Sequence, residues 1–370
     1  MQLLSMLFIR RLFFVFALLM ALSCHNSNDA QSNKPPKALK EYYHDFFPVG
    51  VSVSPASLRT AEAKLVEYHF NSITPENVMK MGRIHPKENE YYWKEADSIV
   101  AFAKRHKMKI RGHTLVWHQE VPDWFFKDAS GNTVAKDVLL QRLKDHITNV
   151  VKRYKGDVYA WDVVNEAISN DADTFYRQSM FYKICGEAYI AKAFEWAHAA
   201  DPGALLFYND YNETDAVKRN KIIQMVQQLR AKGVPIHAIG LQAHWNIFEP
   251  SKKQLKETIE AFAATGLALQ ITELDVSIYP KELHPEQKSA KDFDNTFNAA
   301  MEEKQAKQYK MFFEVFRKNK QYITGVTFWN ISDSHSWLDN FPIRNRKDHP
   351  LLFDENLRPK KAFYEVTDLD

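Results

Sequence analysis

The sequence predicts an α/β fold made of a single (β/α)8 TIM barrel, and two observations support this. Short apolar segments, typical of buried strands, alternate with amphipathic helical segments, which implies a parallel sheet covered on both faces. Eight such strand–helix units occupy about 330 residues, which suits a closed barrel better than an open, doubly wound sheet. Because no second change of composition follows the N-terminal region, we expect one catalytic domain over residues 39–368.

The predicted elements follow one another in a regular order. Each strand is a short apolar run, and the strands are Val49–Val53, Ser72–Pro75, Lys109–Trp117, Ala160–Asn165, Leu205–Asn209, Ala238–His244, Leu267–Glu273 and Gly325–Asn330. Each helix repeats its apolar residues at the spacing that puts them on one face. The helices are Leu58–Phe70, Tyr92–Arg105, Val138–Tyr154, Phe181–Ala200, Ala216–Ala231, Lys253–Thr265 and Lys304–Arg317. No glycine-rich phosphate loop opens any of them, which argues against nucleotide binding.

Residues 1–23 predict an export signal. Arg10 and Arg11 precede an apolar run, Leu12–Leu22, that is too short to span a bilayer as a stable helix. The following Ser-Cys pair resembles the end of a bacterial lipoprotein signal, in which the cysteine becomes the lipidated first residue of the mature chain. We therefore expect an outer-membrane or cell-surface lipoprotein anchored through Cys24, with periplasmic location or ordinary secretion as the alternative.

The rest of the chain is nearly neutral. Residues 24–38 form a polar, proline-containing stretch that we expect to be a flexible linker. The net charge is +3, and two N-terminal arginines supply two of these charges. This balance argues against nucleic-acid binding and against charge-driven membrane binding. Beyond Cys24 the chain has only Cys185, so the mature protein has no pair for an intramolecular disulfide. We expect a monomer with an uncharged or small partner.

Two segments, Trp161–Glu166 and Ile271–Asp275, carry the clearest indication of function. In each, a run typical of a buried strand reaches a glutamate, Glu166 or Glu273, that has no Lys or Arg neighbour in the sequence. Burying a carboxylate without a partner costs several kcal/mol. Two carboxylates delivered from different strands are what glycoside hydrolysis requires: one acid protonates the leaving oxygen, and one carboxylate attacks or activates water.

Polar and aromatic residues gather at the C-terminal ends of the predicted strands, where (β/α)8 barrels carry their active sites. They are Glu76, Asn77, Lys80, His113, Trp117, His118, Asn165, Glu166, Asn209, Tyr211, Gln242, His244, Glu273, Asp275 and Trp329. The histidines are scattered and lack the spacing of a metal site. Asp333 and His335 could form a ligand pair, but a polar loop explains them equally well. We expect no metal and no cofactor.

Several segments resemble the signature blocks of the glycoside hydrolase family 10 xylanases. They are Gly112–His118, Trp161–Glu166, Gln242–His244, Thr272–Asp275, Ser336–Leu338 and Pro350–Asp354. The resemblance extends over nearly the whole chain beyond the linker, with the blocks in the right order. It implies a retaining endo-β-1,4-xylanase that hydrolyses internal linkages of xylan and xylo-oligosaccharides by double displacement.

The resemblance also implies a role for each carboxylate: Glu166 matches the acid/base of the family, and Glu273 matches its nucleophile. A retaining mechanism needs the two groups roughly 5–5.5 Å apart, and at that distance an ionised Glu273 should raise the pKa of Glu166. Asp275 lies two residues after Glu273 on the same strand and faces the same way. By resemblance His244 bridges these two side chains, which would orient Glu273 and keep it ionised.

Substrate contacts are likewise expected from the resemblance. An amide beside the acid typically holds the sugar 2-hydroxyl, and exposed tryptophans stack on the apolar faces of sugar rings. The expected substrate-binding residues are Glu76, Asn77, Lys80, His113, Trp117, Asn165, Tyr211, Gln242, Trp329 and Trp337. Glu76 and Asn77 are also typical of a helix start, which is compatible with substrate contact. His118 either contacts substrate or supports a neighbouring residue.

Two other functions stay open. A β-1,4-glucan hydrolase would use the same scaffold, because the fold does not settle which sugar is bound. A surface polysaccharide-binding lipoprotein without catalysis would have no need for a proton donor opposite a nucleophile. The basic stretch 340–349 is interpreted as a solvated loop, in preference to a contact with acidic side groups on a polymer.

Overall fold

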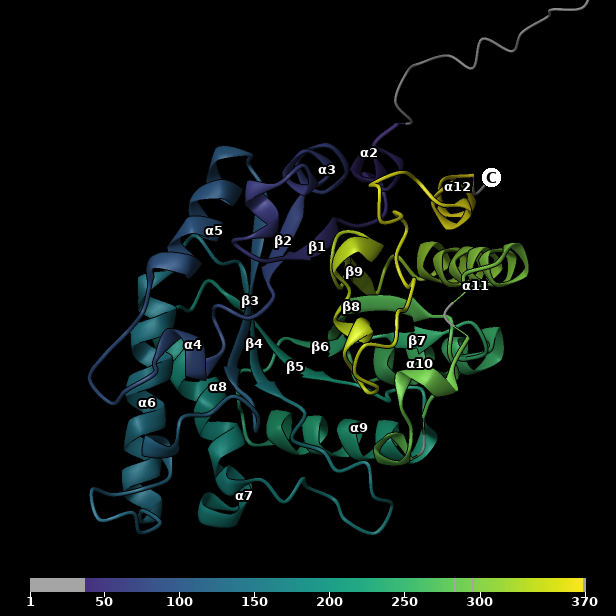
Figure 1. The fold of residues 1–370 in the computed structure, drawn as a ribbon. Coiled ribbons are helices and arrows are strands. Elements are labelled where there is room, and N and C mark those ends of the chain that lie inside the picture. Colours follow the sequence, from purple (N-terminus) through teal and green to yellow (C-terminus); the bar gives the residue numbers. More distant parts are fainter. Residues whose placement is uncertain (1–36, 283, 295, 369–370) are drawn as a thin grey trace, which may run out of the picture. The chain divides into compact units, whose positions relative to one another are not determined.

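Parallel strands close into a barrel in the computed structural model, which describes residues 37–282, 284–294 and 296–368 (Figure 1). Neighbouring strands pair in chain order around the barrel, and β6 closes the ring by pairing with β8. The barrel strands are β1 (Val49–Val53), β2 (Ser72–Pro75), β3 (Lys109–Val116), β4 (Ala160–Asn165), β5 (Leu205–Asp210), β6 (Ala238–Leu241), β8 (Ala268–Ser277) and β9 (Ile323–Phe328). A short further strand, β7 (His244–Asn246), pairs with the end of β8.

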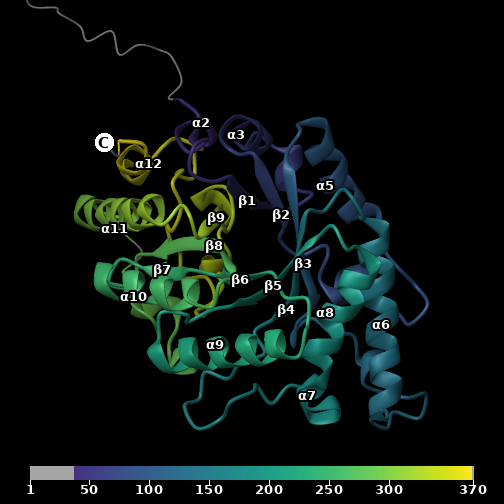
Figure 2. The same ribbon diagram turned by 180° about the vertical axis from the view of Figure 1, so that it is seen from behind.

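Helices connect successive strands and surround them, as the two opposite views show (Figures 1 and 2). They are α2 (Leu39–Tyr42), α3 (Glu62–His69), α4 (Met81–Ile84), α5 (Lys94–Arg105), α6 (Lys136–Arg153), α7 (Met180–Cys185), α8 (Ala188–Ala200), α9 (Ala216–Ala231), α10 (Lys252–Ala263), α11 (Ala299–Lys318) and α12 (Lys361–Thr367). In α5 the buried residues Ala96, Ile99, Val100 and Ala103 recur at helical spacing. The predicted (β/α)8 barrel is confirmed.

Two predicted elements are each divided in the structure. The prediction of one strand over Ala238–His244 is wrong at its C-terminal end. The strand β6 ends at Leu241, Ala243 has a φ of +62°, and the chain becomes extended again only in β7. The helix expected over Phe181–Ala200 is two helices, α7 and α8, separated at Gly186 with a φ of +63°. A left-handed residue interrupts either a regular strand or a regular helix.

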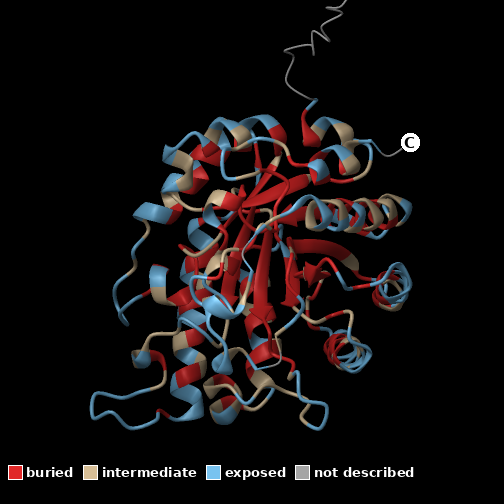
Figure 3. Cartoon of the chain, turned by 45° about the vertical axis from the view of Figure 1, so that its right-hand side comes forward, coloured by how far each residue is buried: buried red, intermediate tan, exposed pale blue. Residues whose placement is uncertain are grey.

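Burial concentrates in the strands, while the outer faces of the helices are exposed (Figure 3). Strand β4 is buried along its whole length, and β8 is buried except at its two terminal residues. Within the barrel, Gly112 of β3 lies against the ring of Trp161 on β4, where an added Cβ would come within 2.1 Å of that ring. A buried polar or charged group on these strands therefore needs a partner inside the barrel.

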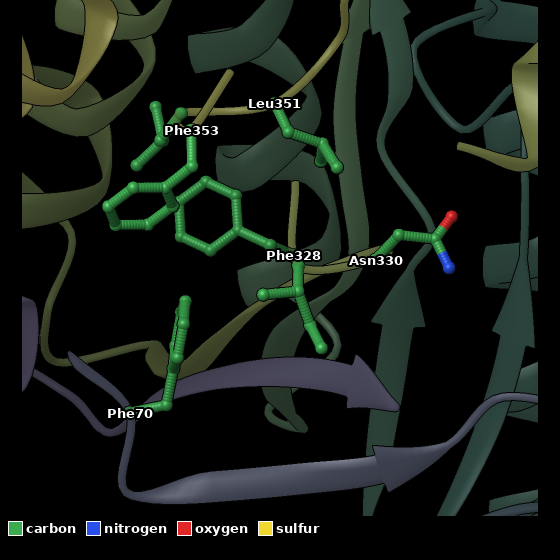
Figure 4. A pocket seen from close by; sticks show the side chains of 7 residues that line it. Phe70, Phe328, Asn330, Leu351 and Phe353 are labelled. Carbon is green, nitrogen blue, oxygen red and sulfur yellow. The ribbon is translucent and has the colours of Figure 1, made fainter. Parts of the chain in front are cut away.

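An apolar pocket is present on one side of the barrel (Figure 4). Its lining residues are Phe70, Phe328, Asn330, Ile331, Leu351, Leu352 and Phe353. Asn330 is the one polar side chain among them, and its amide points away from the aromatic rings. Because the lining holds no carboxylate, we interpret this pocket as part of the core packing and not as a reaction site.

The predicted export signal, the lipidation site Cys24 and the linker up to residue 36 lie outside the described residues. Within residues 37–282, 284–294 and 296–368, no helix is both long and apolar enough to cross a membrane. Cys185 is a buried free thiol at the end of α7, and burial raises its pKa to about 11. A thiol with so high a pKa is a poor nucleophile, which agrees with a packing role.

Candidate active site

The C-terminal ends of the barrel strands bring the two predicted glutamates to one region. The backbone N–H of Glu166, just after β4, donates to the Asn209 carbonyl on β5 at 2.9 Å. The backbone N–H of Glu273, on β8, donates to the Gln242 carbonyl at 2.9 Å. Both side chains are buried, with exposed fractions of 8% for Glu166 and 4% for Glu273.

Three amides join the two carboxylates in one hydrogen-bond network. Gln242 Nε2 donates to Glu166 Oε1 at 3.1 Å and to Asn165 Oδ1 at 3.2 Å. Asn209 Nδ2 donates to the same Asn165 oxygen at 2.9 Å and to Glu273 Oε1 at 2.7 Å. Asn165 Nδ2 in turn donates to Glu166 Oε1 at 3.1 Å. Gln242 and Asn209 therefore each contact both glutamates, one through its side chain and the other through its backbone carbonyl, and so fix their relative orientation.

His244 bridges Glu273 and Asp275, as the sequence predicts. Its Nε2 lies 3.2 Å from Glu273 Oε2 and its Nδ1 lies 2.9 Å from Asp275 Oδ2. Trp337 Nε1 donates to the same Asp275 oxygen at 2.7 Å. Burial alone would lower the pKa of His244, but Asp275 and then Glu273 outweigh it and raise that pKa to about 10. The imidazole is therefore protonated at neutral pH and donates through both nitrogens.

A second set of buried charges lies near the other oxygen of Glu273. His113 Nδ1 is 4.0 Å from Glu273 Oε1 and 2.9 Å from Asp162 Oδ2. Arg111 donates to both oxygens of Asp162, at 2.6 and 3.2 Å. Arg111 and Asp162 are almost completely buried, at 1% and 0% exposure. Each oxygen of Glu273 thus has a histidine ring close to it, His113 near Oε1 and His244 near Oε2.

The surroundings separate the two glutamates in pKa. For Glu273, burial acts to raise the pKa, but the charge of His113, then His244 and Asn209, lowers it to about 2. The pKa of Glu166 is raised, first by burial and then by the Asp210 carboxylate. The charge on Glu273, the cause expected from the sequence, also raises the pKa of Glu166 but contributes less than these two. One glutamate is held ionised and the other is biased towards its protonated form.

Glu166 occupies a left-handed backbone conformation, with a φ of +59°. Such a residue costs about 1–3 kcal/mol and persists where its surroundings hold it. Arg177 provides such a contact, because its Nε donates to the Glu166 carbonyl at 2.8 Å and its Nη2 donates to the Tyr211 hydroxyl at 3.1 Å. Asn170 also donates to that hydroxyl, at 2.6 Å. Arg177 therefore connects the aromatic residue Tyr211 to the backbone of the proposed acid.

Lys80 contacts two other residues expected to bind substrate. Its Nζ donates to Asn77 Oδ1 at 2.7 Å and lies 4.7 Å from the centre of the Trp117 ring. The same ammonium pairs at 3.5 Å with the carboxylate of Glu120, a residue that was not predicted to belong to the site. Glu76 is half-buried directly after β2. These residues form a polar and aromatic group at the ends of β2 and β3.

The remaining predicted aromatic residues pack around the site histidines. Trp329 meets His113 edge-on at 5.2 Å, and Trp337 lies 4.7 Å from the His244 ring. His118 Nδ1 lies 3.9 Å from Glu166 Oε2, and burial chiefly lowers the pKa of His118 to about 4. The structure therefore places a neutral His118 beside the proposed acid. Of the two roles that the sequence left open, substrate contact and support of a neighbouring residue, this position favours support.

Asn209, which the sequence placed at the end of the fifth strand without a role, bridges the glutamates. Three residues around the site were not among those that the sequence placed there. Asp162 and Arg111 form a buried pair, and Glu213 accepts hydrogen bonds from Ala243 and Trp245. A detectable signal exists for Asp162 and Arg111, because a charged residue inside an apolar strand requires a buried partner. Glu213 lies in a loop and offers no such signal.

Ion pairs decide how two polar stretches after β9 are interpreted. Asp333 is paired with Lys360 at 2.8 Å, and across the described ranges no three His, Cys, Asp or Glu side chains are grouped as a metal site would need. The interpretation of 340–349 as a solvated loop is wrong for Arg346. This residue is 2% exposed and pairs at 3.2 Å with Glu282, whose side chain is 4% exposed. Its charge is therefore already neutralised within the protein.

Comparisons with known proteins agree with this geometry. Residues 38–369 match the family model described as glycosyl hydrolase family 10. A β-1,4-xylanase of Dictyoglomus thermophilum is 48% identical over 89% of this chain and 90% of its own. Endo-1,4-β-xylanase B of Paenibacillus barcinonensis is 46% identical over 90% of this chain and 98% of its own. The crystal structure of xylanase XynB from the same organism, complexed with a conduramine derivative, has a TM-score of 0.86 at 45% identity and covers 90% of this chain and 99% of that one. This chain belongs to glycosyl hydrolase family 10.

Proposed function

We propose that this protein is a retaining endo-β-1,4-xylanase in which Glu273 is the nucleophile and Glu166 is the acid/base. The observation that carries the assignment is the opposite treatment of two buried carboxylates within one hydrogen-bond network. Glu273 has a pKa of about 2, and the pKa of Glu166 is raised. Pairs of carboxyl groups whose environments drive their pKa values apart are the arrangement by which glycosidases divide the roles of acid and nucleophile.

In the first step Glu273 attacks the anomeric carbon of a xylose while Glu166 protonates the departing glycosidic oxygen. The new bond joins Glu273 to the sugar, and the leaving chain takes the proton of Glu166. His244 and Asn209 donate to the Glu273 carboxylate, so they fix the direction of attack. This step discharges Glu273, and the pKa of Glu166 then falls because a neighbouring negative charge has disappeared.

In the second step Glu166 acts as the base and removes a proton from water, which attacks the glycosyl-enzyme and releases Glu273. The sugar is displaced twice and keeps its configuration. The amide network supports both steps, because Gln242 donates to Glu166 and Asn165 contacts both Gln242 and Glu166. Each group that positions the acid in the first step also positions the base in the second.

Substrate specificity is proposed to come from the polar and aromatic residues next to the glutamates. Lys80 contacts both Asn77 and Trp117 at the ends of β2 and β3, and Trp329 and Trp337 pack against the two site histidines. Sugar rings stack on such aromatic faces, and polar groups bind their hydroxyls. The relatives named above are xylanases, which supports xylan and xylo-oligosaccharides as substrates.

Replacing each glutamate tests the function. Glu273→Ala should abolish release of reducing sugar from xylan, and retained activity would contradict the assignment of the nucleophile. Glu166→Ala should slow hydrolysis of xylan far more than hydrolysis of an aryl xylobioside, because an activated phenol leaves without a proton donor. Equal losses on the two substrates would contradict the assignment of the acid. Parallel rates on cello-oligosaccharides would identify a glucan-active enzyme instead.

We further propose that the protein is exported as a monomer and carries lipid on Cys24. The support is the sequence alone: two arginines, a short apolar run and a cysteine precede a polar linker. Radiolabelled palmitate should be incorporated into the full-length chain in bacteria and lost in Cys24→Ser. Secretion of an unlabelled parent protein into the medium would contradict lipidation and favour an ordinary export signal.

A further inference from the structure

Glu213 is a buried carboxylate that the proposed reaction does not use. It lies three residues after the end of β5 and is 1% exposed. Its Oε1 accepts two hydrogen bonds, from the Ala243 backbone N–H at 3.2 Å and from Trp245 Nε1 at 3.0 Å. Its Oε2 is buried and has no hydrogen-bond partner. Burying a carboxylate oxygen without a hydrogen-bond partner destabilises the folded protein, so Glu213 is not explained by stability alone.

The two bonds of Glu213 meet a turn with an unusual backbone. This turn, Gln242–Ala243–His244, interrupts β6 and β7, and Ala243 has a φ of +62°. The Ala243 carbonyl is also engaged, by the Trp245 N–H at 2.9 Å and by the Asp275 N–H at 3.4 Å. Alanine does not adopt the left-handed region readily, so the turn depends on the contacts that hold it. Glu213 accepts from the Ala243 N–H, and the contacts to Trp245 and to β8 hold only the Ala243 carbonyl.

The residues on either side of Ala243 each hold one of the proposed catalytic glutamates. Gln242 donates to Glu166 at 3.1 Å, and His244 lies 3.2 Å from Glu273. A displacement of the turn would therefore change both contacts together. We propose, on the basis of the function proposed above, that Glu213 is a positioning residue: through Ala243 and Trp245 it fixes the turn that aligns the acid/base and the nucleophile.

The position requires a hydrogen-bond acceptor of the right length. It does not require a negative charge. Burial, the largest influence, raises the pKa of Glu213 to about 7, and the carboxylate of Asp210 acts in the same direction. The backbone N–H of Glu213 itself, and then the protonated imidazole of His244, act to lower it. Much of the Glu213 population is thus neutral in the acidic range, yet Oε1 still accepts both hydrogen bonds. A glutamine at this position would keep that oxygen in place, whereas an aspartate would withdraw it by one methylene.

These two variants separate positioning from charge. Glu213→Gln should keep kcat on an aryl xylobioside near that of the parent protein, whereas Glu213→Asp should lower kcat by up to about 100-fold, since a displacement near 1 Å can cost that much. KM should change little in both. The reverse pattern, an active aspartate variant and an impaired glutamine variant, would overturn the proposal in favour of a role for the charge. Equal activity of both variants and the parent would also overturn it.

The pH profile provides a readout that a merely structural role would not move. The bond from Gln242 lowers the pKa of Glu166 against the opposing charge of Asp210, and the bond from His244 lowers the pKa of Glu273 against the effect of burial. Weakening both bonds in Glu213→Asp should move the alkaline and the acidic limbs of kcat/KM to higher pH. Unchanged limbs with a proportional loss of rate would instead indicate partial unfolding and overturn the proposal.

Asp201 supplies a matched control at the opposite end of the same strand. It is 5% exposed, precedes β5 and accepts from the Gly203 N–H at 3.0 Å. Asp201→Ala should lower stability and leave kcat and both pH limbs unchanged. If the parent and this control are both inactive on xylan, the proposed function fails. In that case the NMR titration of His244 still tests the inference, because a displaced turn in Glu213→Asp should lower its pKa from about 10, and an unchanged midpoint would overturn it.

Discussion

Replacing His244 with glutamine tests how the protein keeps Glu273 ionised. The pKa of Glu273 is about 2, against an ordinary value of 4.5. At about 1.4 kcal/mol per pKa unit, the site favours the carboxylate by roughly 3 kcal/mol over water. The charge of His113 contributes to this, and His244 contributes both through a hydrogen bond and through its charge. Glutamine keeps an N–H donor near Glu273 and removes the charge.

We expect His244→Gln to raise the pKa of Glu273 by about one unit, which is about 1.4 kcal/mol. The nucleophile must be ionised to attack, so the acidic limb of kcat/KM should move up by the same amount. The assay is kcat/KM for an aryl xylobioside measured from acidic to neutral pH. His237→Gln is the matched control, because His237 precedes β6, accepts from the Leu206 N–H at 3.0 Å and lies at the other end of that strand.

An acidic limb that stays in place in His244→Gln, with the same loss of rate at every pH, would refute the reasoning. Acid unfolding must be excluded by circular dichroism at each pH, because Glu273 also contributes to stability. Its folded pKa is depressed, so its contribution is present above pH 4.5 and is lost as the pH falls towards 2. The shift is therefore interpreted only at pH values where both variants remain folded.

Three further predictions concern stability. Arg111→Met should lower the free energy of unfolding by about 3–5 kcal/mol in urea titrations, because it leaves the buried charge of Asp162 without its bidentate partner; a loss below about 1 kcal/mol would contradict this. Gly112→Ala should also destabilise the protein, by about 1–3 kcal/mol or more, because its Cβ would lie 2.1 Å from the Trp161 ring; an unchanged Tm would show that the ring moves freely. Glu213 has a folded pKa of about 7, raised by burial, so its contribution to stability is present below its unfolded value of 4.5 and is lost as the pH rises through 7. Glu213→Gln should therefore exceed the parent in stability at pH 8 by up to roughly 3 kcal/mol, and a parent whose stability does not fall between pH 5 and 8 would contradict this.

The barrel and the two glutamates could be predicted because their signals are local. A buried strand such as β4 is a continuous apolar run, and a helix such as α5 repeats its apolar residues at helical spacing. Glu166 and Glu273 stand out because each follows a run typical of a buried strand and has no Lys or Arg neighbour. Their placement at the strand ends follows from the fold class, since the C-terminal ends of the strands share one face of a barrel.

The interruption between β6 and β7 could not be predicted in the same way. Leu241-Gln242-Ala243-His244 has no glycine or proline to indicate a turn. Ala243 adopts its φ of +62° because Glu213, thirty residues earlier, and Asp275, on another strand, bond to its backbone. A conformation imposed by residues distant in sequence leaves no trace in the local pattern.

By itself the sequence determined the order of strands and helices and the two carboxylates, and its resemblance to the family implied the histidine that joins Glu273 to Asp275. The elements and the carboxylates depend on residue type and on spacing within one segment. Only the tertiary structure decided which groups set the pKa of each glutamate: His113 together with His244 and Asn209 for Glu273, and burial with Asp210 for Glu166. The physical reason is that electrostatic interaction and desolvation depend on distance and on exclusion of water, and both arise only when separate strands close into a barrel.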